Sequence, residues 1–495
     1  MSVFSMSTLL AAFVVPLLLL YSSRRLRHRL PPGPKGLPIL GNVFNAPKSF
    51  EWLAYQDWSR QYNSDIVHFE ILGIHFVVLN SAQATVDLFE KRSNVYSDRA
   101  GYDRNWGLMG YGDYWRAHRR LFHQYFRPAV VSTYHPSSAK AVREMISALR
   151  DAPDRFVEHI RHMARSNILK IVYDIEIKPE GDPLIAIIEE GVRVFSRVTV
   201  AGAYLVDSFP ILRHIPAWFL GAQFKRDAAK WRPFVEEMYM RPHREVKASF
   251  DNGNTKPCLV TDALFEISRD KDGRDSLIDE EVVIGTLGTA YAAASDTTIL
   301  AMLNFVLAIL VHPEVQKIAQ EELDNIVGRD RLPEIEDRDT LPFITAVMKE
   351  CLRWRPPLPL ALPHRSVADD EYRGFHIPAG SVVIGNAWAI LHDGERYPDP
   401  DVFNPLRFLD GEGRLRKDVP DPMDVFGYGR RICPGRYFAL DVIWLAMANI
   451  LAAFSVEKPV DERGNVIEPT GEYLTGTFSF PAPFKADFKV RGRAR

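Results

Sequence analysis

The chain has 495 residues, of which 46% are hydrophobic and 25% are charged, a balance typical of a globular protein with one large fold or two to three ordinary domains. Its 61 lysines and arginines nearly equal its 63 aspartates and glutamates, and no basic stripe carries interleaved aromatic residues, so we expect no nucleic-acid partner. Three cysteines, an odd number, argue against a disulfide framework and for a reducing compartment.

The N-terminal segment, residues 1–23, is predicted to be a membrane anchor, because it carries no charged side chain. At about 1.5 Å per residue, a helix of this length reaches about 34 Å, enough to cross a hydrocarbon core of about 30 Å. A cleaved secretory signal is the alternative, but its positive charges would precede the apolar run, and no small-x-small cleavage site is present. By the positive-inside rule, the rest of the chain stays cytosolic, because four arginines follow the anchor at once, namely Arg24, Arg25, Arg27 and Arg29.

A basic and proline-rich hinge, residues 24–40, is predicted to join this anchor to a single body, residues 41–495. Pro31-Pro32-Gly33-Pro34 cannot continue a helix, and its stiffness would hold the body at a set angle to the membrane.

The first part of the body combines helices with a short hairpin. Residues 50–62 and 82–91 have helical patterns, whereas residues 66–70 and 75–79 are β-branched and aromatic runs separated by a glycine, which predicts a hairpin. Residues 97–114 are rich in Gly, Asp and Asn and are predicted to form a loop over a ligand.

Trp115 and Arg119 are the first candidate binding residues. Their spacing of four places them on one face of a helix, where an indole N–H and a guanidinium together suit an anionic carboxylate. A Trp–Arg stack on a helix surface is the alternative.

Residues 145–250 are mostly helical, with one interruption at residues 207–216, where apolar residues surround two prolines. This interruption is either an access loop that rests on a membrane or a buried connector, and the sequence favours neither.

The longest helical candidate runs from Glu280 to Val311, about 48 Å at about 1.5 Å per residue, and is apolar nearly all round, so we expect it to be buried. Within it, Asp296 and Thr297 follow small residues. Threonine can hydrogen-bond to a carbonyl one turn earlier and loosen the helix, which predicts a groove there. A satisfied polar kink is the alternative, and Tyr291 either shapes the groove or packs outward.

Glu350 and Arg353 lie three apart on a predicted helix and face together. An exposed pair of this kind contributes only about 0.3 to 0.5 kcal/mol, and the pattern is frequent by chance. Residues 356–365 then form an extended apolar run that ends in His364 and Arg365, and residues 477–484 are predicted to be a loop that reaches back over a pocket.

Cys433 lies in a glycine-rich loop, residues 426–435, just ahead of an apolar helix that starts at Arg436. We expect a tight hairpin at Gly427–Gly429 whose amides point at the sulfur, and a helix N-terminus that favours the thiolate.

The thiolate of Cys433 is a candidate metal ligand. Tetrahedral zinc is a poor match, because Cys258 and Cys351 are distant in sequence and no C-x-x-C spacing occurs. Haem needs only one strong axial ligand from the protein. A buried cysteine in a glycine-rich turn is the alternative.

The loop resembles the cysteine-ligand signature of the cytochrome P-450 superfamily, the haem-thiolate monooxygenases, through five residues: Phe426, Gly429, Arg431, Cys433 and Gly435. Further matches run from about residue 31 to about residue 490 in family order, most like the membrane-anchored microsomal members of fungi. The resemblance implies a mainly α fold with a small β-rich lobe, and haem b held between the long central helix and the Cys433 loop.

The resemblance also implies a role for each candidate residue. Cys433 would be the axial ligand of the haem iron, and Asp296 and Thr297 would relay protons, with Ala294 in place of the family's common glycine. The remaining cofactor-binding residues would be Phe426, Arg431, Gly435, Trp115, Arg119 and His364, with Arg365 as the alternative to His364. A structural triad would comprise Glu350, Arg353 and Arg407, and the substrate pocket would include Tyr291, Ala293, Leu358, Leu362 and Phe478, with Phe480 as a second tip of the C-terminal loop.

The activity implied is insertion of one oxygen atom from O2 into an apolar small molecule. The chain contains no G-x-G-x-x-G ahead of a helix, so electrons would come from a partner, an NADPH–cytochrome P-450 reductase, with cytochrome b5 as a further donor. The resemblance implies a single-pass protein of the endoplasmic reticulum membrane with a cytosolic catalytic domain. A cationic docking face for the reductase is expected at Arg116, Arg120, Arg127 and Arg430.

Two alternatives remain open, a haem-thiolate isomerase or dehydratase that needs no reductase, and a haem-binding sensor without enzymatic activity. The acid and the alcohol at positions 296 and 297 argue against both.

Overall fold

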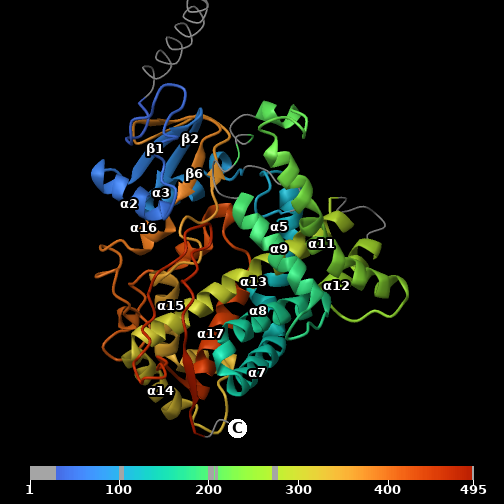
Figure 1. Cartoon of the computed structure of the whole chain (residues 1–495), viewed down its shortest axis with the longest axis vertical. Coiled ribbons are helices and arrows are strands. Elements are labelled where there is room, and N and C mark those ends of the chain that lie inside the picture. The colour runs from blue at the N-terminus through green and yellow to red at the C-terminus, as the bar shows by residue number, and fades with distance from the viewer. Residues whose placement is uncertain are drawn as a thin grey trace, which may run out of the picture.

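A computed structural model describes residues 29–99, 105–198, 204, 206, 210–269 and 277–492 (Figure 1). The predicted anchor, residues 1–23, and the arginines up to position 27 lie outside the described residues. The rest forms a large helical body with a small sheet-rich lobe at one end, which confirms the mainly α fold expected from the sequence.

The lobe is built on a four-stranded sheet of order β1-β2-β6-β3. The predicted hairpin is confirmed, because β1 (Ile66–Ile71) pairs antiparallel with β2 (Ile74–Leu79). β6 (Val382–Gly385) pairs parallel with β2 and antiparallel with β3 (His364–Arg365). Outside this sheet, β4 (Asp370–Tyr372) pairs antiparallel with β5 (Phe375–Ile377), and β7 (Phe454–Glu457) with β8 (Asp487–Val490). His364 therefore enters the lobe from a segment far away in sequence.

Helices make up most of the body, and the predicted helices at residues 50–62 and 82–91 are present, the second partly as a π-helix. The elements not yet given are α2 (Glu51–Gln61), α3 (Ala82–Thr85), the π-helix η1 (Val86–Lys91), α4 (Ser93–Tyr96), α5 (Asp113–Phe126), α6 (Pro128–Val131), α7 (His135–Asp151), α8 (Phe156–Tyr173), α9 (Pro183–Val198), α11 (Gln223–Asp251), α12 (Leu259–Arg269), α13 (Glu280–Val311), α14 (Pro313–Ile326), α15 (Pro342–Trp354), α16 (Ala387–Leu391) and α17 (Arg436–Ala453).

The long helix α13 crosses the middle of the body with the bounds expected from the sequence (Figure 1). One of its free N-terminal amides is capped, because the Asp279 carboxylate accepts from the Val282 N–H at 2.9 Å. Its apolar surface is covered by α5, α8, α11, α12, α15 and α17. Among the described residues, α13 and α17 are long and apolar enough to cross a membrane, but 78% and 67% of their most apolar windows are buried in this core, so their composition reflects packing.

Tyr291 packs outward from α13 and against α8 and α11, which corrects its expected place in the substrate pocket. Its ring meets Tyr173 edge-on at 5.9 Å, and its hydroxyl donates to the Met238 carbonyl of α11 at 2.7 Å. That carbonyl needs a donor, because Pro242 lies one turn later inside α11 and has no N–H. Ala293, two residues on, points about 200° away around the helix.

Substitution of Tyr291 by Phe should therefore cost stability and leave ligand binding unchanged. It leaves a buried carbonyl without a donor, a loss of about 1 to 3 kcal/mol in the free energy of unfolding. Pro242→Ala restores a main-chain N–H, so in that background the same substitution should cost clearly less. Denaturant unfolding of the four proteins measures this coupling, and an equal cost in both backgrounds would contradict the assignment.

Candidate active site

Two short 3-10 turns, Met423–Phe426 and Gly429–Arg431, precede Cys433 in the chain. The Cys433 N–H donates to the Phe426 carbonyl at 2.7 Å, which closes the loop on itself. α17 begins at Arg436, so the cysteine precedes a helix N-terminus, as expected from the sequence.

Gly427 and Gly429 serve the loop in different ways. Both have positive φ angles, 78° and 53°, which favour glycine. A Cβ at Gly429 would also lie 2.1 Å from the Phe89 carbonyl oxygen, whereas a Cβ at Gly427 would meet nothing within 4 Å. Close packing of the loop against η1 therefore depends on Gly429, and Gly427 is required only by its backbone conformation.

The amides near the Cys433 sulfur come from Gly435 and Arg436, and not from Gly427–Gly429 as expected. Burial raises the pKa of the Cys433 thiol, while these two amides and the guanidinium groups of Arg119 and Arg436 lower it. The amides at the start of α17 thus favour the thiolate, as expected, while burial acts against them and is the larger of the two effects on the pKa. A metal cation on the sulfur would supply the missing charge.

Three guanidinium groups converge beside the loop, those of Arg99, Arg119 and Arg431. Burial is the largest cause that lowers their pKa values, to about 10 for Arg119 and Arg431, and neighbouring positive charges add to it. Arg119 donates to the Ile432 carbonyl at 2.8 Å, and Arg431 lies 4.7 Å over the Trp115 ring. Within the part of the chain that the structure describes, none of the three is paired with a carboxylate.

Three buried nitrogens in this cluster have no hydrogen-bond partner among the described residues: Trp115 Nε1, Arg99 Nε and Arg431 Nη1. Buried, unpaired cations and orphaned donors are costly, so the cluster fits an anionic group with several acceptor oxygens. The two carboxylates of haem are such a group, and Cys433 is an axial ligand of the right kind beside them. The donor set therefore fits haem.

His364 lies inside this cluster, whereas the alternative, Arg365, is exposed on β3. The Nδ1 of His364 contacts the Tyr96 carbonyl at 2.6 Å, and its ring packs on Phe89 at 4.1 Å. Burial and the nearby arginines lower its pKa. Arg99 is the residue that sequence reasoning missed, because one arginine ahead of a glycine-rich loop carries no distinguishing pattern.

Asp296 and Thr297 lie on an accessible stretch of α13. The Thr297 hydroxyl donates to the Ala293 carbonyl at 3.0 Å, the bond one turn back that its sequence predicts. Burial raises the pKa of Asp296, and Arg165, 3.5 Å away, lowers it. Ala293 is exposed beside them, and the small side chain of Ala294 is half-buried.

The expected pocket residues outside α13 lie on two segments that touch. Leu358 and Leu362 are partly buried on the extended run, and the Ser479 N–H donates to the Pro357 carbonyl at 3.1 Å. This bond brings the C-terminal loop back to the run, as expected, with the rings of Phe478 and Phe480 6.4 Å apart. Their assignment to a substrate pocket stays a prediction.

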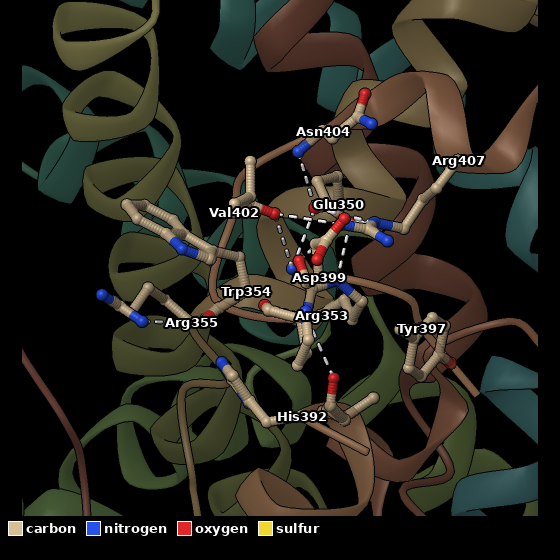
Figure 2. A network of polar contacts seen from close by, with 12 residues as sticks. Glu350, Arg353, Trp354, Arg355, His392, Tyr397, Asp399, Val402, Asn404 and Arg407 are labelled. Atoms are coloured by element: carbon tan, nitrogen blue, oxygen red, sulfur yellow. Dashed lines mark hydrogen bonds and ion pairs between the residues drawn. The ribbon is translucent and has the colours of Figure 1, made fainter. Parts of the chain in front are cut away.

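Glu350, Arg353 and Arg407 form one buried network (Figure 2). Arg353 binds both Glu350 oxygens, at 2.7 and 2.9 Å, and Arg407 Nε lies 3.1 Å from each. Arg353 also donates to the carbonyls of Leu391 and Pro400. The network thus ties α15 to the segment that leads toward the Cys433 loop, in keeping with a structural role.

Comparison with known proteins settles the family. The family model for cytochrome P450 matches residues 31–479. The chain belongs to the cytochrome P450 family. A cytochrome P450 monooxygenase of Armillaria gallica is 41% identical over 94% of this chain and 92% of its own. Cytochrome P450 monooxygenase 98 of Postia placenta is 40% identical over 98% and 95%, and the tryptamine 4-monooxygenase of Psilocybe cyanescens is 36% identical over 98% of both chains.

Membership of this family makes the protein a monooxygenase of the P450 fold with a haem-thiolate cofactor, a redox partner and a small-molecule substrate. The described residues hold no cluster of three or more His, Cys, Asp or Glu side chains suited to a metal ion.

Gly429→Ala should reduce haem loading and stability far more than Gly427→Ala. The first forces a methyl group against the Phe89 backbone, whereas the second adds only backbone strain of about 1 to 3 kcal/mol. Haem absorbance per protein and the unfolding temperature measure both effects. Similar losses in the two variants would contradict the packing role of Gly429.

Proposed function

We propose that this P450 is a membrane-anchored haem b monooxygenase that inserts one oxygen atom from O2 into an apolar small molecule, with electrons from an NADPH–cytochrome P450 reductase. One observation carries the proposal: a half-buried cysteine lies beside buried guanidinium groups that have no carboxylate partner among the described residues, and beside an orphaned indole N–H. Haem bound there supplies the one-electron and oxygen chemistry.

The residues around the site have separate tasks. Cys433 ligates the iron, while Trp115 and the guanidinium groups of Arg119 and Arg431 hold the haem carboxylates. Arg99 and His364 supply the remaining polar groups beside the haem carboxylates.

Ala293 and Ala294 leave room on α13 beside the polar pair. The raised pKa of Asp296 lets its carboxyl hold a proton nearer neutral pH, and the Thr297 hydroxyl can turn from the Ala293 carbonyl to pass that proton into the groove.

The substrate is proposed to be apolar and of small to medium size, because the expected pocket residues are alanine, leucine and phenylalanine. One relative is named a tryptamine 4-monooxygenase, and this name supports an aromatic compound as one class of substrate to test. The acid and alcohol of the proton relay favour a monooxygenase over an isomerase or a sensor.

A membrane location is supported by exposed apolar side chains. Trp218 and Leu220 are 82% and 93% exposed, just after the 207–216 interruption, and Phe44 of the lobe is 74% exposed. In the described part of that interruption Arg213, His214 and Pro216 are exposed, and Leu212 and Ile215 are half-buried, which argues against a fully buried connector. We infer that the anchor at residues 1–23 and the hinge at 24–40 tether the catalytic domain to the endoplasmic reticulum membrane, facing the cytosol.

Electron transfer should slow as salt is added, if the reductase docks on the four arginines expected from the sequence. All four are exposed: Arg116, Arg120, Arg127 and Arg430. Exposed charges are screened over a Debye length of about 10 Å at 0.1 M salt. Stopped-flow reduction by the NADPH reductase, with cytochrome b5 tested as a second donor, measures the rate, and a rate independent of salt would contradict this docking face.

Cys433→Ala should abolish the far red-shifted Soret band of the reduced, carbon-monoxide-treated protein, because that band requires a thiolate on the haem iron. Cys258→Ala is the matched control, since this buried cysteine lies near Thr261 and away from the loop. The control should keep the band. Retention of the band in Cys433→Ala would refute the proposed ligand.

A further inference from the structure

Three charged side chains from three helices meet at the acid of α13, which is one of them. Arg165 of α8 lies 2.7 Å from Glu189 of α9 through Nη1, and 3.5 Å from Asp296 of α13 through Nη2. The exposed fractions of the side chains are 7% for Arg165, 50% for Glu189 and 15% for Asp296. One nearly buried cation is therefore shared between an outer and an inner carboxylate.

Arg165 lies closer to one of the two carboxylates than to the other. The distance to Glu189 is that of a charge-assisted hydrogen bond, whereas the distance to Asp296 exceeds the usual 2.7 to 3.2 Å range. Arg165 Nε is buried and has no partner among the described residues. Because a guanidinium stays protonated, Arg165 cannot relay a proton itself and acts only by holding a carboxylate.

We propose that Glu189 competes with Asp296 for Arg165, and that this competition sets how readily Asp296 takes up the proton it passes to Thr297. Arg165 and Glu189 are then positioning residues for the relay. The inference rests on the proposed function, because it assumes that Asp296 is the proton-carrying acid.

A movement of α9 relative to α8 would change the competition between Glu189 and Asp296 for Arg165. α8 packs along α13, which fixes Arg165 relative to Asp296, whereas α9 packs mainly against α11. A shift of α9 away from α8 would withdraw Glu189 and leave Arg165 to Asp296. The Asp296 carboxylate would then stay ionised until α9 moved back toward α8.

The charges around Asp296 set the direction of each effect. Burial raises its pKa, Arg165 and then Arg161 lower it, and Glu189 raises it. Loss of the Glu189 charge therefore lowers the pKa of Asp296, both directly and by freeing Arg165. Loss of the Arg165 charge raises it.

Infrared difference spectroscopy of the haem-loaded full chain tests this. The protonated-carboxyl band of Asp296, assigned by its loss in Asp296→Asn, is titrated with pH in each variant. We expect Glu189→Gln to move the midpoint to lower pH and Arg165→Met to move it to higher pH, with Arg165→Lys between Arg165→Met and the unsubstituted protein. Glu190→Gln is the matched control, because Glu190 is bound to Arg193 of its own helix, at 2.9 Å from Arg193 Nε.

The opposite signs keep the inference open to refutation. Midpoints that move in the same direction for Glu189→Gln and Arg165→Met, or a Glu189→Gln shift no larger than that of Glu190→Gln, would overturn it. Both glutamate variants change partly exposed side chains, so the test survives if Arg165→Met fails to fold. The Soret band of the reduced carbon-monoxide complex, measured on the same samples, reports separately on the proposed function. A normal band with unmoved midpoints overturns the competition alone.

Discussion

The organisation of the site depends on buried positive charge that the described chain does not neutralise. Removing an ion from water costs several kcal/mol, and Arg99, Arg119 and Arg431 bear this cost without a carboxylate partner among the described residues. Elements distant in sequence, among them α5, β3 and the Cys433 loop, meet at this point. An anionic cofactor that binds only the folded chain relieves the cost, so its binding energy becomes folding energy.

Rigid supports on either side of the loop keep the sulfur in place. On one side, Gly429 lets the loop touch the Phe89 backbone, a contact that any side chain would prevent. On the other, the fully buried Glu350–Arg353 pair fixes the end of α15 against backbone carbonyls. A buried ion pair of this kind contributes little net stability, but loss of one partner is costly, so it specifies one arrangement of the segment between α15 and the loop.

Features that depend on local sequence patterns were predicted correctly. Features that depend on contacts between segments distant in sequence were not. The bounds of α13, the hairpin and the Cys433 loop follow from periodicity and glycine placement. The prediction of which amides lie near the Cys433 sulfur was wrong, because these amides come from the start of α17 and not from the Gly427–Gly429 turn. Tyr291 was misplaced, because its partner is a carbonyl freed by a proline some fifty residues earlier. Arg99 and Arg165 carry no pattern, since each matters only through side chains brought near by folding.

The loose contact between Arg165 and Asp296 suits a proton-carrying acid better than a close one would. A buried carboxylate with no cation would be costly when ionised and would remain protonated, so it would give up its proton poorly. A carboxylate in a tight bidentate pair would stay ionised and would rarely carry a proton. At 3.5 Å from a guanidinium already bound to Glu189, Asp296 lies between these limits, and its pKa is raised by burial without loss of a counter-ion. Burial and Arg165 thus act on the pKa of Asp296 in opposite directions, as the proposed role of an acid that alternately takes up and releases a proton requires.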